Sequence, residues 1–223
     1  MSRSVLFDTE TTGLDPLHGD RVIEVAAIEL RNGLPTNLTF HRLIDPERDI
    51  PADASRIHGI TSADLAGKPK FAAIVEDLLA FFGDDPLIAH NAAFDFGFLD
   101  AELGRLRRPA LDRARMIDTL ALAKTRFPGM PNSLDALCRR FDIDLSARTT
   151  HNALLDCKLL ADVYVELTGG RQQGFDLAAD TGLALVEYRH EGSRTPRTMS
   201  VGANERAAHD AFVASMKDPV WQI

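Results

Sequence analysis

The stretch "FDTETTG", residues 7–13, places two carboxylates, Asp8 and Glu10, directly after the apolar run Val5-Leu6-Phe7. That run predicts a short buried strand that the two carboxylates end. In an extended chain residues i and i+2 point to the same face, so the carboxylates should be neighbours. Two like charges about 4 Å apart repel by about 4 kcal/mol at an effective dielectric of about 20. The pair therefore needs a proton, a cation or open water, and either a divalent metal or a solvated strand end before the turn at residues 11–13 would meet that need.

The composition is that of an ordinary globular chain of 223 residues, with 45% hydrophobic and 26% charged residues. This length has room for one full domain of about 150 residues and an appendage. The sequence has no apolar run long enough to span a bilayer, and residues 1–4 lack the apolar region of a signal peptide, so we expect a cytoplasmic protein. Cys138 and Cys157 have no C-x-x-C spacing and are expected to be buried free thiols rather than zinc ligands.

The charge balance limits how the protein can bind nucleic acid. Asp and Glu number 33 against 25 Lys and Arg, which gives a formal charge of -8. This argues against tight binding through phosphate neutralisation alone. Local contact through bound metal ions remains open.

The order of predicted elements indicates an α/β fold with a mixed sheet flanked by helices. The apolar run 22–30, the hairpin signal Asn32-Gly33 and the extended pattern 38–44 predict, with the first strand, an antiparallel three-stranded start. Single strands are expected at 86–90 and 116–119, and helices at 71–82, from Ala92 with Asn91 as its cap, at 133–141, and at 152–167 with a stop at Gly169-Gly170.

The character of the sequence changes after residue 170, where Gly, Arg, Thr and Ser become frequent. We therefore expect a folded domain over residues 1–170. A linker over 171–203, with one apolar patch at 183–188, would connect it to a C-terminal helix and tail over 204–223. The C-terminal part as a whole is expected to be flexible.

The predicted helix 152–167 carries a carboxylate on its apolar face. At about 100° per residue, Asp156 lies on the core side of this helix. A buried carboxylate costs several kcal/mol unless it is paired, so Asp156 is either in an ion pair with Lys or Arg from another element or a metal ligand. His151, five residues earlier, could face the same cavity as a base, although a histidine at a helix start is often a surface or capping residue. The solvated stripe of the helix consists of Lys158, Asp162 and Glu166.

A further acid, Asp95, lies one turn into the helix that begins at Ala92, where the helix dipole alone would favour it. Together with Asp8, Glu10 and Asp156 it makes a set of acids at the ends of apolar elements. Oxygen ligands without cysteine suit Mg²⁺ or Mn²⁺. Two such ions can flank a phosphodiester, one generating hydroxide and the other stabilising the leaving oxygen. The residues thus predict metal-assisted phosphodiester hydrolysis.

Three motifs in this order resemble those of the DEDDh (DnaQ-like) 3′-to-5′ exonucleases. They are D-T-E-T-T-G from Asp8, N-x-x-x-D from Asn91 to Asp95, and H-x-A-x-x-D from His151 to Asp156. Further matches narrow the resemblance to the family of proofreading epsilon subunits of bacterial DNA polymerase III: IHGIT at 57–61, HNAAFD at 90–95, FPG at 127–129 and NSLDALC at 132–138. The resemblance covers about residues 4–170 and implies a ribonuclease H-like fold and stepwise release of nucleoside 5′-monophosphates from a DNA 3′ end.

The resemblance also implies roles for the acidic residues and the histidine. Asp8, Glu10 and Asp156 would hold one divalent ion, Mg²⁺ or Mn²⁺. Asp8 would also contact a second ion, which Asp95 would meet largely through water. His151 would be the general base that deprotonates the attacking water. All five of these residues are present in the sequence.

Substrate contacts follow from the same resemblance. The backbone of Thr11 and the side chain of Glu10 would meet the terminal 3′-hydroxyl. His58, Asn91 and Phe94 would line the terminal nucleotides of a single-stranded or frayed DNA end. The preference for deoxyribose is implied by the resemblance alone.

The linker contains a candidate tether. Gln172, Phe175 and Leu177, within "QQGFDL", resemble the short peptide that binds the bacterial sliding clamp. A polar linker with incidental apolar residues is the alternative. A tether would suit an acidic nuclease that holds DNA weakly, because linkage raises the effective concentration to the order of mM.

The C-terminus contains a second candidate tether. Residues 204–217 predict a capped helix with Phe212 on its apolar stripe, and the only tryptophan, Trp221, follows it. A terminal helix with an aromatic anchor resembles a partner-docking peptide, and docking on its own domain is the alternative. The epsilon family ends in such a segment, which attaches to the polymerase alpha subunit.

Two other functions compete with a polymerase-associated exonuclease. One is a free-standing DEDDh nuclease that acts on RNA 3′ ends and does not need the tail. The other is a chiefly structural adaptor between polymerase and clamp, with a residual site. The intact acids and His151 argue against the adaptor.

Overall fold

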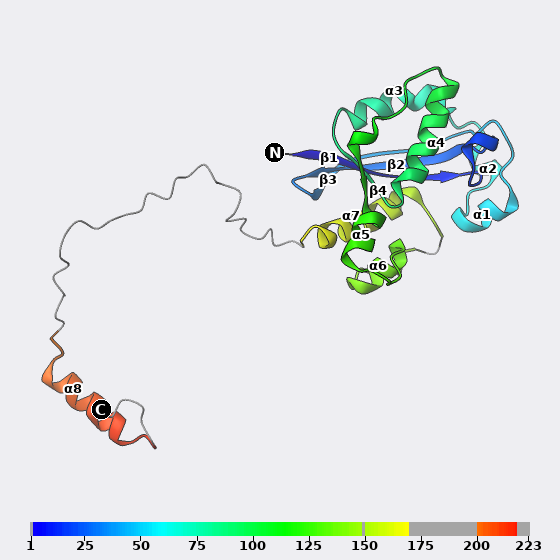
Figure 1. Ribbon diagram of the computed structural model, residues 1–223. Coiled ribbons are helices and arrows are strands. Elements are labelled where there is room, and N and C mark those ends of the chain that lie inside the picture. Colours follow the sequence, from blue (N-terminus) through cyan, green and yellow to red (C-terminus); the bar gives the residue numbers. More distant parts are fainter. Residues whose placement is uncertain (1, 149, 170–199, 218–223) are drawn as a thin grey trace, which may run out of the picture. The chain divides into compact units, whose positions relative to one another are not determined.

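The structure, a computed structural model, describes residues 2–148, 150–169 and 200–217. Within residues 2–169 a five-stranded sheet lies between two groups of helices (Figure 1). The strand order is β3-β2-β1-β4-β5, with β1 at Arg3–Thr11, β2 at Val22–Arg31, β3 at Leu34–Leu43, β4 at Leu87–Ala89 and β5 at Met116–Asp118. The first three strands are antiparallel, whereas β4 runs parallel to β1 and β5 parallel to β4. The predicted mixed sheet with an antiparallel start is confirmed.

The helices divide between the two faces of the sheet. α3 and α4 cover one face, and α5, α6 and α7 cover the other (Figure 1). The described helices of this part are η1 Pro16–His18, α1 Ala52–His58, α2 Ser62–Leu65, α3 Phe71–Phe82, α4 Ala92–Arg105, η2 Arg113–Arg115, α5 Thr119–Arg126, α6 Leu134–Arg140 and α7 Ala153–Leu167.

Strand β1 supplies side chains to both cores. Val5 and Phe7 pack in the core under α3 and α4, whereas Leu6 packs in the core under α7. Because side chains alternate along a strand, Asp8 and Glu10 continue the face of Leu6 toward α7. The alternation of β1 therefore aims both carboxylates at the helix that carries Asp156.

The prediction that the two carboxylates follow the first strand is wrong, because they lie within it. Pairing with β2 continues past the apolar run, with Asp8 opposite Ala26 and Glu10 opposite Glu24, and a register shift follows Glu10. Backbone pairing, which the apolar pattern does not report, sets the end of the strand at Thr11. The carboxylates are thus held by a rigid ladder rather than by a loop.

Two turn predictions have different outcomes. Asn32 and Gly33 both have positive φ, as a hairpin between twisted strands requires, so the predicted hairpin is confirmed. Asn91 is the N-cap of α4, but its side chain makes no cap hydrogen bond with the described first turn. Its φ is 64°, and its backbone N–H donates to Asp118 Oδ1 at 3.0 Å. The predicted side-chain cap is therefore wrong, and the left-handed backbone, which asparagine tolerates, replaces it.

The start of α7 agrees with the prediction. Asn152 caps it, because the side-chain Oδ1 accepts a hydrogen bond from the Leu155 N–H at 3.0 Å. α7 ends at Leu167, and Gly169 follows with a φ of 126°. Cys138 and Cys157 are buried free thiols, as predicted.

The C-terminal helix α8, Ala203–Ala214, belongs to a separate unit and is described by itself. The helix predicted over 204–217 is present, although it begins one residue earlier and ends three residues earlier. The predicted side-chain cap is absent, because glycine, Gly202, occupies the N-cap position. Its Phe212 side chain is 60% exposed. None of the described helices combines the length and apolar character that crossing a bilayer requires. Several predictions lie outside the described residues: the helix stop at Gly170, most of the linker with Gln172, Phe175 and Leu177, the patch 183–188, and Trp221.

Candidate active site

A pocket of about 940 Å³ opens where the chain leaves β1 and β4. These strands are parallel, so their carboxyl ends lie at the same edge of the sheet, where open α/β sheets form their binding crevices. The residues predicted for catalysis, metal binding and substrate binding in the folded domain all line this pocket: Asp8, Glu10, Thr11, His58, Asn91, Phe94, Asp95, His151 and Asp156. The fold thus brings together side chains from β1, α1, α4, α7 and the segments that precede α4 and α7.

The carboxylates on β1 have strongly raised proton affinities. Burial raises the pKa of Glu10 to about 8, and the negative charges of Glu24 and Asp156 add to this effect. The pKa of Asp8 lies well above its ordinary value, chiefly because of burial and then because of the charges of Asp95 and Glu10. In the absence of a cation this site therefore favours holding protons, as the repulsion between Asp8 and Glu10 predicts.

Asp95 is fixed against β1. Its Oδ1 accepts hydrogen bonds from the Thr9 N–H at 3.0 Å and from Thr9 Oγ1 at 2.7 Å. Burial raises the pKa of Asp95 to about 7, although the two bonds from Thr9 act in the opposite direction. Because both bonds reach the same oxygen, the strand orients this carboxylate without using its second oxygen.

Asp156 is paired with a residue that the sequence analysis missed. Arg148 binds it through two contacts, Nε to Oδ1 at 2.6 Å and Nη2 to Oδ2 at 2.6 Å. The guanidinium also donates from Nη1 to Asp135 Oδ1 at 2.7 Å and contacts His151 Nδ1 at 3.2 Å. The structure therefore contains the ion pair that was the alternative to a metal ligand. The signal in the sequence was a lone arginine three residues before His151.

The donor atoms of the pocket fit a divalent cation. Glu10, His151 and Asp156 each offer one ligand atom, and these atoms lie within 4.8 Å of one another. The two carboxylates of this set suit Mg²⁺ or Mn²⁺, and the set contains no thiolate of the kind that structural zinc sites use. Asp8 is not in this group of three, but it lies on the same face of β1 and lines the same pocket. Its predicted role as a ligand remains a proposal.

His58 offers a hydrogen-bond donor at the wall of the pocket. The Ile60 N–H donates to His58 Nδ1 at 3.0 Å, so the proton of the neutral ring must lie on Nε2. Burial lowers the pKa of His58, which keeps the ring neutral. Nε2 is buried and has no hydrogen-bond partner among the described residues. A buried donor of this kind fits the predicted contact with an oxygen of the substrate.

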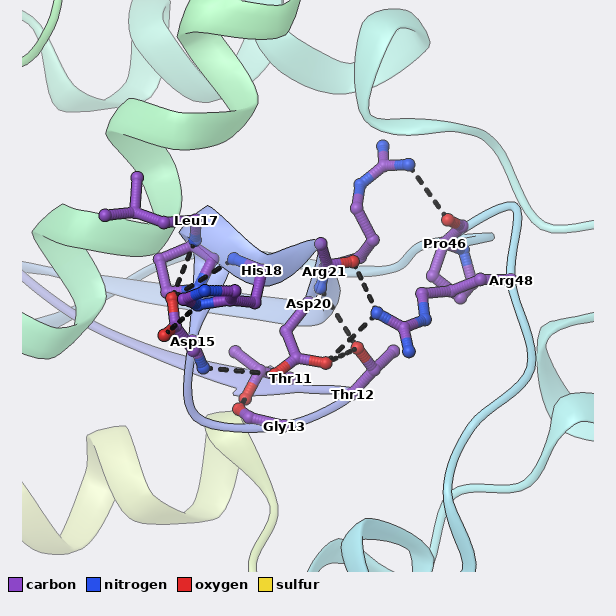
Figure 2. Close-up of polar contacts among 12 residues, drawn as sticks. Thr11, Thr12, Gly13, Asp15, Leu17, His18, Asp20, Arg21, Pro46 and Arg48 are labelled. Carbon is purple, nitrogen blue, oxygen red and sulfur yellow. Dashed lines mark hydrogen bonds and ion pairs between the residues drawn. The ribbon is translucent and has the colours of Figure 1, made fainter.

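The carboxylate of Asp20 holds the loop that follows β1 (Figure 2). We call residues 11–13 the TTG loop. Asp20 accepts hydrogen bonds from Thr12 Oγ1 at 3.1 Å, from the Asp15 N–H at 3.0 Å and from Arg48 Nη1 at 3.1 Å. A Cβ added to Gly13 would lie 2.2 Å from Asp20 Oδ2. Glycine is therefore required here by close approach, and the loop forms one wall of the pocket.

The chain is similar to known exonucleases in both sequence and structure. The exonuclease family model RNase_T matches residues 5–164. The "DNA polymerase III subunit epsilon" of Rickettsia felis is 45% identical over 221 residues, which cover 96% of each chain. Among solved structures, "Exonuclease X in complex with 5' overhanging duplex DNA" has a TM-score of 0.58 and 29% identity, and covers 75% of this chain and 91% of that chain.

A more distant structure confirms the fold. The nuclease domain of 3'hExo, a DEDDh family member bound to rAMP, has a TM-score of 0.63 at 17% identity and covers 75% of this chain and 92% of that chain. The sheet, the pocket and the family model together define the class of the ribonuclease H-like exonucleases. Within that class, the chain belongs to the family of DNA polymerase III epsilon subunits.

Proposed function

We propose that this chain is the proofreading exonuclease of a bacterial replicative DNA polymerase. It removes nucleotides from a DNA 3′ end by hydrolysing the terminal phosphodiester, and it releases nucleoside 5′-monophosphates. The observation that carries the proposal is the pocket in which the ligand atoms of Glu10, His151 and Asp156 lie within 4.8 Å of one another, and which Asp8 and Asp95 also line. The similarity over 96% of the chain to an epsilon subunit supports the substrate and the setting.

Two divalent ions would be held by the acids of this pocket. Glu10, Asp156 and Asp8 would hold one, and Asp8 would also contact the other, which Asp95 would meet largely through water. When bound, such ions polarise the scissile phosphate, activate the attacking water and stabilise the leaving oxygen. The raised pKa values of Asp8, Glu10 and Asp95 support this assignment, because cations rather than protons would offset the gathered negative charge at neutral pH.

The remaining residues bind the substrate and move the proton. His151 would take the proton of the attacking water at a ring nitrogen. His58 Nε2–H would donate to an oxygen of the terminal nucleotides. Phe94, whose ring centroid lies 4.9 Å from that of Phe98, offers an anchored aromatic wall for a base or sugar. The backbone of Thr11 would meet the terminal 3′-hydroxyl, and Asn91 would line the same end.

Association with the polymerase is the second part of the proposal. The relatives are named as subunits of DNA polymerase III. In the described part of the tail, α8 exposes Phe212. We propose that this helix, with Trp221, binds the polymerase alpha subunit, and that Gln172, Phe175 and Leu177 bind the sliding clamp. Both sites would hold an acidic nuclease near the DNA end.

The nature of the sugar separates this function from a nuclease of RNA ends. We expect the purified chain to shorten a single-stranded DNA faster than an RNA of the same sequence in the presence of Mg²⁺. Asp156→Asn is the inactive control, because the amide keeps the shape of the side chain but not its charge. Faster removal of ribonucleotides by the wild type would favour the RNA nuclease instead.

A further inference from the structure

The guanidinium of Arg148 contacts the residues that the proposed metal site needs. It binds both oxygens of Asp156 at 2.6 Å and contacts His151 Nδ1 at 3.2 Å. The arginine side chain is only 10% exposed. Its charge also acts on the neighbouring acids, because it lowers the pKa of Glu10 against the effect of burial. Arg148 is thus a largely buried cation in direct contact with a carboxylate and the histidine of the pocket.

This arrangement competes with a cation on Asp156. Two well-formed, short hydrogen bonds take the carboxylate lone pairs that point toward Arg148. A divalent ion bound to the same oxygens would lie within a few ångströms of the guanidinium, where two positive charges repel strongly. The His151 Nδ1 lone pair is directed at the same guanidinium, so it is not free to accept a proton from water. One side chain therefore restrains both a metal ligand and the proposed base.

The structure also contains a second ion-pair partner for Arg148, Asp135, which could hold the guanidinium after it leaves Asp156. Nη1 already contacts Asp135 Oδ1 at 2.7 Å, and the Asp135 side chain on α6 is 39% exposed. A small rotation of the guanidinium would keep that ion pair while releasing Asp156. Two arrangements of the same side chain, one on Asp156 and one on Asp135 alone, then provide the two states that a cation can bias.

We propose that Arg148 is the resident counter-ion of the metal site, a positioning residue that holds Asp156 and His151 in the metal-free enzyme and is displaced toward Asp135 when a divalent cation binds. This inference rests on the proposed metal site. Arg148 keeps the buried Asp156 carboxylate paired in the metal-free state, because an unpaired buried charge is strongly destabilising. It also competes with the cation, so metal binding and release of the proposed base become one event.

Metal affinity, measured without substrate, tests the proposal. The dissociation constant of Mn²⁺ is obtained by electron paramagnetic resonance for the full chain and for two variants, Arg148→Gln and Arg148→Lys. Arg108→Gln is the matched control, since it removes one positive charge from an ion pair with Glu76 outside the pocket. We expect the dissociation constant of Mn²⁺ to be lower by about tenfold or more in Arg148→Gln than in the wild type, which is within the usual range of coupling between two ligands.

Arg148→Lys separates competition from simple electrostatics. Lysine keeps the charge but loses the planar fork that binds both oxygens of Asp156. Displacement therefore predicts that Arg148→Lys binds Mn²⁺ more tightly than the wild type does. A pure charge effect predicts equal affinities, because lysine keeps the positive charge. We also expect both variants to have a lower melting temperature in EDTA than the wild type, with Arg148→Gln lower than Arg108→Gln.

A direct readout is the Arg148 side-chain Nε–H resonance, assigned by its loss in Arg148→Lys. We expect it to be protected from exchange in EDTA and to lose that protection at saturating Mg²⁺. Mn²⁺ binding to either Arg148 variant that is equal to or weaker than in the wild type would overturn the inference, and so would an unchanged resonance at saturating Mg²⁺. Failure of the wild type to bind Mn²⁺ would overturn the proposed metal site as well.

Discussion

At the scale of single residues, the function depends on carboxylates that a folded chain would normally avoid placing together. Asp8, Glu10 and Asp95 lie in one pocket with raised pKa values, and burial is the largest cause in each case. Backbone pairing of β1 with β2 holds Asp8 and Glu10 in place, and two hydrogen bonds from Thr9 hold Asp95. Buried carboxylates that repel one another without a counter-charge should bind a divalent cation strongly, because the cation neutralises them.

The raised pKa of Glu10 predicts how metal stabilisation depends on pH. Its folded-state pKa is about 8 and its ordinary value is 4.5. Between these values the folded metal-free protein binds a proton that the unfolded chain has released, so the free energy of unfolding falls as pH rises through this window. A cation replaces that proton, so the rise in melting temperature caused by Mg²⁺, relative to EDTA, should be larger at about pH 8 than at about pH 6.

Thermal unfolding of Glu10→Gln is the control for this prediction. The amide does not titrate, so much of the pH dependence of the Mg²⁺ effect should disappear. A melting-temperature rise that is the same at both pH values in the wild type, or smaller at the higher pH, would contradict the assignment of Glu10.

The residues that could be identified from the sequence are those that break the pattern of their own element. Asp156 interrupts the apolar face of a helix, and Asp8 and Glu10 interrupt a buried strand. Arg148 could not be found in this way, because it precedes α7 in a segment without periodicity. Its role depends on tertiary contacts with α6 and α7, which spacing along the chain does not encode.

At the scale of elements, the antiparallel start of the sheet and the helices α3, α4, α6, α7 and α8 follow from apolar periodicity and turn residues, whereas the strand order and α1, α2 and α5 were not predicted. What periodicity does not give is the extent of backbone pairing, and this is why β1 continues through its acidic residues to Thr11. It also does not give the left-handed backbone at Asn91, which depends on Asp118 from the end of β5. Both differences lie at the pocket, where tertiary contacts rather than local sequence preferences set the backbone conformation.

The TTG loop gives a prediction at this scale. Gly13→Ala should displace the loop, because the new methyl would lie 2.2 Å from Asp20 Oδ2, in a carboxylate that three hydrogen bonds to its two oxygens hold in place. We expect kcat/KM on single-stranded DNA to fall about tenfold or more, and the free energy of unfolding to fall by about 1–3 kcal/mol, as for other overpacked sites. Steady-state kinetics and urea unfolding measure the two effects.

Gly97→Ala is the matched control for the TTG loop. Gly97 lies within α4, and a Cβ added there meets nothing within 4 Å. Alanine should stabilise the helix by about 0.5–1 kcal/mol and leave activity unchanged. Equal kinetics for the two variants would mean that the TTG loop does not shape the pocket.

At the scale of the whole molecule, catalysis and attachment should be separable. The pocket is built entirely from residues 2–169, whereas α8 belongs to a separate unit and exposes Phe212. Deletion of residues 204–223 should therefore retain nuclease activity and lose co-purification with the polymerase alpha subunit. Phe212→Ala should weaken that complex, since buried aromatic anchors dominate many interfaces.

Asp210→Ala on the same helix is the control for the tail, because it changes an exposed charge rather than the aromatic residue. It should leave the complex intact. Co-purification of the truncated chain with alpha at the level of the full chain would refute the docking role of the tail.

The central claim is that the acids of the pocket form a metal-dependent site that acts on DNA 3′ ends. Its most direct test is the degradation of a 5′-labelled single-stranded DNA with Mg²⁺, comparing the wild type with Asp8→Ala/Glu10→Ala. We predict a ladder that shortens from the 3′ end with the wild type, is abolished by EDTA, and is absent in the double variant. Equal ladders from the two proteins, or no degradation by either, would contradict the account and bring forward the structural adaptor between polymerase and clamp.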